Sequence, residues 1–293
     1  MPIAGPNRPI VLGVDAVDPS PAATAWAADE ANRCHVPLHL VHCVPPLVSG
    51  RRDLERSWHE GLRREGWAQI EKVRFLALER HPELAVTGEV VDGIPGQVLV
   101  GRSPRAGLVV LGSRQLSPVA ERLSTYSVAL PVSAQAACPV VVAHEPEHAT
   151  GRPPYVVVGV DGSPGSAAAV DFAHSYADQR GASLRAIFVW QPSFFAVVDE
   201  HATEQEAHRL LSEATAGRTD RYPDTGLTHE VLRGHPVAEL TGASRQALAV
   251  VVGRRGHGGF TGMRLGSVPR GLLHHARCPI ITVPAGPAGD QGG

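Results

Sequence analysis

The segment "PIVLGVDAVDPSPAATAWAADEA", Pro9 to Ala31, returns in recognisable form as "YVVVGVDGSPGSAAAVDFAHSYA", Tyr155 to Ala177. In each copy a short aliphatic run precedes an aspartate, a turn and an amphipathic stretch, which is the pattern of a strand followed by a helix. Runs this apolar indicate strands buried on both faces, as in a parallel sheet covered by helices. The pair of segments therefore predicts an α/β unit present twice in one chain.

Further matches follow in the same order, which makes the repeat decisive for the fold. They pair "LHLVHCVPP" with "LRAIFVWQP", "EVVDGIPGQVL" with "EVLRGHPVAEL", "LVVLG" with "AVVVG", and "ACPVVVAH" with "RCPIITVP". The polar join "HEPEHATGRPP", residues 144–154, has the composition of a linker. We therefore predict two domains, residues 1–146 and 153–293, each an α/β sandwich with a five-stranded parallel sheet.

Hydrophobic periodicity also predicts individual elements. A long amphipathic helix is expected over Asp53 to Arg80, and Pro164 is expected near the start of the first helix of the second domain. The aliphatic runs place the strands of the first domain at Ile10–Val14, Leu38–Cys43, Leu84–Val91, Leu108–Leu111 and Val140–Val142.

Composition limits the classes of function. The chain has 293 residues, 43% of them hydrophobic and 19% charged, which is typical of globular proteins. A net charge of -2 gives no general attraction to nucleic acid or to an anionic membrane. No apolar run reaches the roughly 18 residues of a membrane span, and no signal segment precedes the first strand. We therefore expect a cytoplasmic protein that binds neither nucleic acid nor membrane.

The cysteines and histidines give little sign of a disulfide framework or a metal site. Cys138 and Cys278 each precede a proline at equivalent points of the repeat, which suggests a buried, reduced position of the core. His39 and His42 lie near Cys34 and Cys43, but strand alternation sends the two histidines to opposite faces. Structural zinc requires ligands that converge on one point, so a metal site is disfavoured.

The segment "VVVGRRGHGGFTGMRLGSVPRGLLHHARCP", Val250 to Pro279, carries the chemistry. Gly253, Gly256 and Gly266 allow backbone N–H groups to approach an anion, some of them with positive φ. Gly266 and Ser267 then open a helix whose N-terminus attracts phosphate, with Ser267 as N-cap or as hydroxyl donor. A flexible surface loop with glycines at its tip is the alternative.

Two other phosphate-binding loops are excluded. The P-loop requires Gly-Lys, and the only lysine, Lys72, lies in a predicted helix. The dinucleotide fingerprint requires a glycine where Thr261 follows Gly256 and Gly258. Arg254, Arg255 and His257 either add positive charge near phosphates or only line a solvated loop.

The spacing G-x2-G-x9-G-S, with Asp161 ending the first strand and "CP" before the last, resembles the universal stress protein family. The resemblance covers nearly the whole chain, as a tandem two-domain member. It implies flavodoxin-like sandwiches, of the adenine nucleotide alpha hydrolase-like type, with strand order 3-2-1-4-5. It also implies ATP as the ligand, a regulatory role in stress or dormancy, and homodimers joined through last strands or domain surfaces. Mg²⁺ on the ATP phosphates is compatible with such a site.

The resemblance assigns roles to individual residues. Asp161 matches the acid on the ribose or adenine side, and Val189 matches the valine whose backbone contacts the adenine edge. Val268 joins the three glycines and Ser267 in the phosphate and ribose cradle. Taken alone, Asp161 fits a helix N-cap or turn residue equally well. Gly234 and Pro236 match a loop near the site, although turn geometry also accounts for them.

The first domain departs from this pattern. Asp15, Gly112 and Ser127 are retained, together with Val128, whereas Cys43 replaces the valine of the second strand. Gln115 replaces the second glycine, Tyr126 lies where the third is expected, and Glu121 adds negative charge. Side chains at these positions resist positive φ and fill the space for phosphates. We predict weak or absent ATP binding here, or a nucleoside ligand without phosphates.

Three functions remain open. A regulatory ATP-binding protein fits best, because no general base paired with a nucleophile is evident near the loop. A slow ATPase or adenine-nucleotide hydrolase would depend on Arg255 and His257, the nearby candidates for water positioning and charge stabilisation. A nucleotide-free interaction scaffold is the third hypothesis. In the first, ATP orders the loop and alters a surface that a regulatory protein partner recognises.

Overall fold

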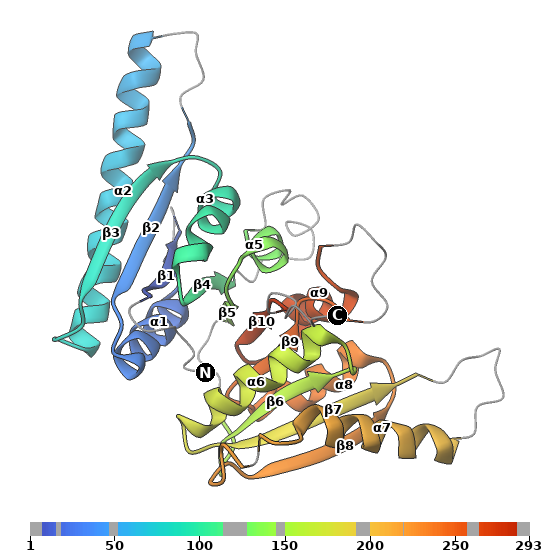
Figure 1. Ribbon diagram of the computed structural model, residues 1–293. Helices are drawn as coiled ribbons and strands as arrows, with labels where there is room; N and C mark the ends of the chain where they lie inside the picture. The colour runs from blue at the N-terminus through green and yellow to red at the C-terminus, as the bar shows by residue number, and fades with distance from the viewer. Residues whose placement is uncertain are drawn as a thin grey trace, which may run out of the picture. The chain divides into compact units, whose positions relative to one another are not determined.

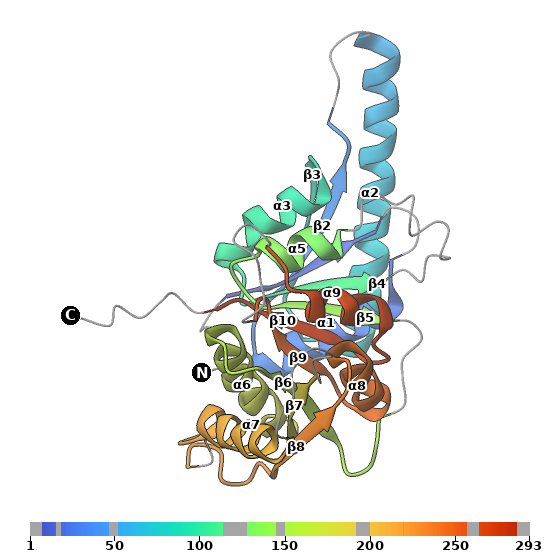
Figure 2. The ribbon, with the colours of Figure 1, turned by 90° about the vertical axis from the view of Figure 1, so that its right-hand side faces the viewer.

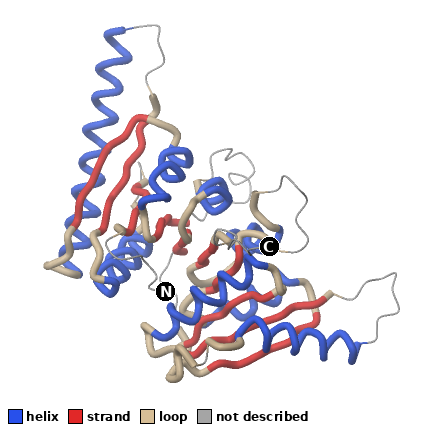
Figure 3. Tube along the Cα trace, in the orientation of Figure 1, coloured by secondary structure: helices blue, strands red, loops and turns tan. Residues whose placement is uncertain are grey.

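The computed structural model describes residues 8–15, 19–46, 52–113, 128–144, 150–191, 200–218, 220–256 and 264–285. The chain divides into two compact units, residues 2–147 and 148–293, called here the first and second domain. Each is an α/β sandwich in which strands and helices alternate (Figures 1 and 3). The predicted fold class is confirmed.

In the first domain the strands run in the order β3-β2-β1-β4-β5, and all described pairs are parallel. Helices α1 and α2 pack on one face of this sheet, and α3 and α5 on the other (Figures 1 and 2). The elements are β1 Ile10–Val14, α1 Pro21–Cys34, β2 Leu38–Val44, α2 Arg52–Arg80, β3 Val86–Asp92, α3 Pro95–Arg102, the 3-10 turn η1 Ser103–Arg105, β4 Leu108–Ser113, α5 Ala129–Gln135 and β5 Val140–His144.

The second domain repeats this topology with the order β8-β7-β6-β9-β10, again parallel. Both domains therefore have the order 3-2-1-4-5 that the resemblance implies. The elements are β6 Tyr155–Val160, α6 Pro164–Asp178, β7 Ser183–Trp190, α7 Glu200–Thr215, β8 Leu227–Arg233, α8 Pro236–Ala243, the 3-10 turn η2 Ser244–Gln246, β9 Val250–Gly253, α9 Ser267–His275 and β10 Ile280–Val283.

The aliphatic runs form the core of each sheet. Ile10 and Leu108 in the first domain, and Val157 and Val250 in the second, have no exposed surface. One predicted strand start is wrong: β3 begins at Val86, because Leu84 still belongs to the turn after α2 and donates its N–H to the His81 carbonyl. The helix predicted from Asp53 to Arg80 is α2, and Pro164 is the first residue of α6.

The core also accounts for the cysteines and histidines. Cys138 and Cys278 are buried, and burial raises the pKa of each thiol to about 12. His39 bonds to the side chains of β3, whereas His42 is buried beneath α2 on the opposite face of the sheet. Within the described ranges, no helix has the length and apolar character that a membrane span requires.

Candidate functional site

The carboxyl ends of β6, β7 and β9 bring the predicted residues of the second domain together. Val160, the last residue of β6, is opposite Phe188, so Asp161 follows β6 at the level of Val189 in β7. Gly253 ends β9 opposite Val283. Because β6 lies between β7 and β9, the chain changes direction of crossover at this point, where open α/β sheets bind their ligands.

Asp161 occupies a turn between β6 and α6. Its Oδ1 accepts a hydrogen bond from the Ser163 N–H at 3.0 Å, while the residue as a whole is exposed. A Cβ added to Gly256 would lie 2.0 Å from Asp161 Oδ2. The second glycine of the motif therefore leaves the space that the Asp161 carboxylate fills. Its bond to the Ser163 N–H also confirms the alternative prediction that Asp161 is a turn residue.

The first glycine of the motif serves helix packing. A Cβ on Gly253 would lie 2.5 Å from the carbonyl carbon of Gly165, and one on Gly165 would lie 2.4 Å from the Arg255 carbonyl oxygen. The start of the loop and the first turn of α6 therefore pack backbone against backbone. The prediction that glycines of the loop adopt positive φ is wrong for the three described: Gly253, Gly256 and Gly266 lack it, whereas Gly162 has φ 79°.

Ser163, which was not among the predicted site residues, joins the start of α6 to the start of the loop. Its Oγ accepts from the Ser166 N–H at 3.1 Å as the N-cap of α6, and donates to the Arg255 carbonyl at 3.4 Å. Ser163 is buried, with 5% of its surface exposed, because the loop covers it. A serine directly before Pro164 is an N-cap signal that sequence reasoning had the means to find.

The start of α9 supplies the other side of the site. Gly266 is the N-cap, with φ -67° and ψ 163°, and its N–H donates to the Arg254 carbonyl at 3.0 Å. Ser267 is consequently the first helical residue, so its predicted role as N-cap is wrong. Among the described residues no side chain caps α9, and its first-turn N–H groups present the positive end of the helix dipole.

Two arginines follow β9 at this edge. Burial, together with the charge of Arg255, lowers the pKa of the half-buried Arg254. An anion bound near these two arginines would offset the repulsion between their charges. Val189 is half-buried on β7, where its backbone pairs with Leu232 of β8. His257 lies outside the described residues.

The sequence model of the universal stress protein family matches residues 6–144 and, a second time, residues 155–284. The chain belongs to the universal stress protein family. A universal stress protein of Mycobacterium tuberculosis is 36% identical over 289 residues, covering 93% of this chain and 95% of its own. A second one from that species is 33% identical over 282 residues, with 93% and 95% covered.

Solved structures agree on the fold. A universal stress protein from Archaeoglobus fulgidus has a TM-score of 0.68 at 16% identity, covering 95% of this chain and 97% of that chain. A putative universal stress protein from Pseudomonas aeruginosa has a TM-score of 0.62 at 17% identity, covering 95% and 94%. These likenesses extend over both domains of this tandem universal stress protein.

The first universal stress domain differs at the same edge. Asp15 follows β1, and Cys43 is half-buried on β2, where burial and then the charge of Glu89 raise the pKa of its thiol to about 11. A Cβ on Gly112 would lie 2.4 Å from Ser20 Cβ, at the start of α1. The predicted Ser127, with Gln115, Glu121 and Tyr126, lies outside the described residues, whereas Val128 is the N-cap of α5.

Gly234 and Pro236 also lie at the carboxyl edge, beyond β8. Gly234 donates its N–H to the Trp190 carbonyl at 3.0 Å, and Pro236 is the first residue of α8. A Cβ on Gly234 would meet Glu239 Oε1 at 2.4 Å. Local packing therefore accounts for both residues, which is the turn interpretation of this pair.

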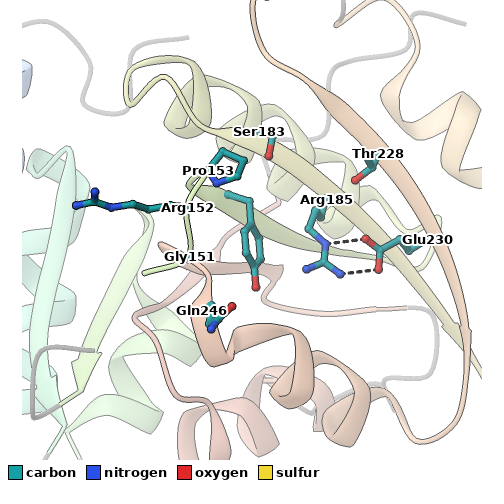
Figure 4. Close-up of a pocket in the computed structure, with 9 residues that line it drawn as sticks. Gly151, Arg152, Pro153, Ser183, Arg185, Thr228, Glu230 and Gln246 are labelled. Carbon is teal, nitrogen blue, oxygen red and sulfur yellow. Dashed lines mark hydrogen bonds and ion pairs between the residues drawn. The ribbon is translucent and has the colours of Figure 1, made fainter. Parts of the chain in front are cut away.

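A pocket of about 340 Å³ lies at the other edge of the second sheet, where β6, β7 and β8 begin (Figure 4). Arg185 and Glu230 face each other there and are joined by two hydrogen bonds of 2.6 and 2.8 Å. The Arg185 guanidinium also lies over the Tyr155 ring, 4.7 Å from its centroid. This pocket is therefore separate from the edge that carries Asp161, and the charges of Arg185 and Glu230 within it neutralise each other.

Proposed function

We propose that the second domain binds ATP at the carboxyl edge of its sheet and that the bound nucleotide regulates the protein in a stress or dormancy response. The observation that supports this most is the convergence of Asp161, Val189 and the glycine loop at the change of crossover direction. Residues from three separate stretches of sequence come together there, beside the N-terminus of α9, which no side chain of the described residues caps.

The described residues suit the parts of an adenine nucleotide. Asp161 Oδ1 accepts a hydrogen bond from the Ser163 N–H, and a carboxylate at this position is the kind of acceptor that ribose hydroxyl groups donate to. The positive end of α9, with the Ser267 hydroxyl, and the adjacent Arg254 and Arg255 favour phosphates. The Val189 backbone, at the end of β7, is the group proposed to contact adenine. Mg²⁺ would be carried by the phosphates.

Gly256 provides the sharpest test of the ATP site. Gly256→Gln introduces the first domain's own residue and forces the Asp161 carboxylate and the loop apart, because a Cβ has 2.0 Å of room. We expect ATP affinity to fall at least tenfold by isothermal titration calorimetry. Gly242→Gln on α8 is the matched control, because a Cβ there would meet nothing within 4 Å in the described part of the chain. Absence of ATP binding heat in the wild type would contradict the proposal.

The number of nucleotides per chain tests the difference between the domains. Mass spectrometry of nucleotide released from denatured protein identifies the ligand and its stoichiometry together. We expect one adenine nucleotide per chain, held by the second domain, with less than a tenth of that amount in the Gly256→Gln variant. Two per chain would contradict the prediction that the first domain binds ATP weakly or not at all.

Measuring whether bound ATP is recovered unchanged distinguishes a regulatory ATP-binding protein from an ATPase. We expect ATP to be recovered unchanged after long incubation, because the described part of the loop offers phosphate-binding groups and no base paired with a nucleophile. Hydrolysis that Arg255→Ala or His257→Ala abolishes would establish the slow ATPase instead. No nucleotide in the purified protein and no binding heat would favour the interaction scaffold.

A further inference from the structure

Helix α2 of the first domain exposes most of the large apolar side chains that the described surface carries. Trp58, Trp67, Phe75 and Leu76 are 62%, 42%, 62% and 37% exposed. The equivalent helix of the second domain, α7, has 16 residues against the 29 of α2. Figures 1 and 2 show α2 running along β2 and β3 and extending past their carboxyl ends.

The two faces of α2 differ in what they contact. His59, Gly66, Ile70, Val73 and Ala77 recur at helical spacing, are buried, and form the face that packs on the sheet. The opposite face carries Gly61, Arg64, Ala68, Glu71 and Phe75, spaced three and four residues apart; we call these five residues the outer stripe.

Gly61 has no packing reason among the residues that the structure describes. Glycine weakens a helix interior relative to alanine, yet a Cβ on Gly61 would meet no described atom within 4 Å. Phe75 lies on the same stripe with 62% of its surface in solvent. The side chain of an exposed phenylalanine could fill the space above a glycine on a helix surface. Within one α2 helix, however, Phe75 and Gly61 lie too far apart to make this contact.

The outer stripe is symmetric about Ala68. Gly61 and Phe75 each lie seven residues from it, and Arg64 and Glu71 lie four and three residues from it. If a second α2 packs antiparallel with Ala68 at the two-fold axis, Phe75 of each helix covers Gly61 of the other. In that same register Arg64 of each helix faces Glu71 of the other, within about 1.5 Å along the axis.

The charges of the stripe are available for this pairing. Arg64 has no ion-pair partner among the residues that the structure describes. Glu71 makes one exposed pair with Arg74 of its own helix, at 3.6 Å, and such pairs contribute little to stability. Two shape contacts and two charge contacts that share one centre of symmetry are what an isologous dimer requires, whereas an unrelated partner would impose no symmetry.

We propose that the outer stripe of α2 is an antiparallel self-association surface, occupied by α2 of a second copy of this chain. The contact is limited to one pair of helices, so its buried area is expected to be below the roughly 1,200 Å² that most stable interfaces bury. We therefore expect a weak dimer, with a dissociation constant in the micromolar range. This inference is independent of nucleotide binding.

Charge reversal in the full-length protein tests the pairing by sedimentation equilibrium. Arg64→Glu places like charges opposite each other at both contacts, and Glu71→Arg does the same, so each variant should associate at least tenfold more weakly than the wild type. The double variant should regain association. Mixing the two single variants should yield a heterodimer, because only the mixed pair has opposite charges at each contact.

Two controls keep the test specific. Arg209→Glu makes the same charge change at an exposed position of α7 and should leave association unchanged. Gly61→Gln improves helix propensity while blocking the Phe75 contact, so it should weaken association without lowering thermal stability. A wild type that is monomeric up to about 0.5 mM, wild-type association in Arg64→Glu, or a mixture that associates no better than its components would overturn the proposal.

Discussion

The two domains share a sheet topology but differ in the connection between their first strand and first helix. Six residues separate β1 from α1, whereas three separate β6 from α6. Both helices nonetheless begin with a capping serine followed by proline, at Ser20 and Ser163. In the ungapped repeat Ser20 pairs with Ser166, so the structure moves the helix start by about one turn.

The first and second glycines of the motif have different neighbours in the structure. Gly112 and Gly253 both lie against the start of the first helix, so the first glycine of the motif is needed for packing in either domain. Gly256 instead lies against Asp161, which belongs to the candidate site. Packing therefore accounts for the retention of Gly112 in the first domain, whereas we propose that loss of the second glycine weakens ATP binding there.

The largest expected effect comes from filling the first glycine. We expect Gly112→Ala and Gly253→Ala each to lower the free energy of unfolding of their domain by about 1–3 kcal/mol, because the new methyl group lies within 2.4 and 2.5 Å of neighbouring atoms. Chemical denaturation with ATP absent measures both.

The controls are Gly101→Ala and Gly242→Ala, whose methyl groups would meet none of the described residues within 4 Å, so both should be neutral or slightly stabilising. If Gly253→Ala destabilises its domain and Gly112→Ala does not, the first glycine has a role in the second domain that packing does not explain, and the comparison fails.

Acid sensitivity is the next effect in size. His174 on α6 is fully buried, and neither ring nitrogen has a hydrogen-bond partner among the described residues. Burial, then the charge of Arg218, lowers the pKa of His174, with Asp171 opposing. Below about pH 6.5 the histidine is therefore protonated in the unfolded chain but stays neutral in the folded protein. The free energy of unfolding then decreases by up to about 1.4 kcal/mol for each unit by which the pH is lowered.

The substitution His174→Phe removes this proton linkage while keeping a ring against Tyr222, whose centroid is 5.9 Å away. Thermal unfolding between pH 5 and pH 8 should show a flatter acid limb for the variant and little change above pH 7. An identical slope in wild type and variant would assign the acid sensitivity to other groups, such as His42, whose pKa burial also lowers.

The hydrophobic periodicity and the internal repeat predicted the fold, because each strand or helix is encoded by residues close together in the sequence. Aliphatic runs such as Ile10–Val14 specify buried strands wherever they occur, and five of them alternating with helices leave few topologies. Boundaries were less certain: Leu84 was predicted as strand, but its N–H bonds to the His81 carbonyl in the turn after α2. The family resemblance supplied the strand order.

The candidate site was predicted only in part, because some reasons for its residues are long-range. Spacing alone suggested positive φ for the loop glycines. Their actual constraint is the proximity of Gly253 to Gly165, and of Gly256 to Asp161, across about ninety residues of sequence. No local pattern records such distances. Ser163 combines both cases. Its N-cap role could have been predicted from the local sequence, whereas its bond to the Arg255 carbonyl joins residues far apart in the chain.

The capping serines give the smallest and most selective test of the comparison. Ser20→Ala and Ser163→Ala should each lower the free energy of unfolding by about 1 kcal/mol, because each loses an N-cap bond of 3.1 Å. Ser163→Ala also releases the Arg255 carbonyl, so it should weaken ATP binding a few-fold, whereas Ser20→Ala should leave it unchanged. Calorimetry on both variants at a temperature where both are folded separates the effects. Equal ATP affinities in the two variants would mean that the α6 cap acts on stability alone, and that the loop finds its position without Ser163.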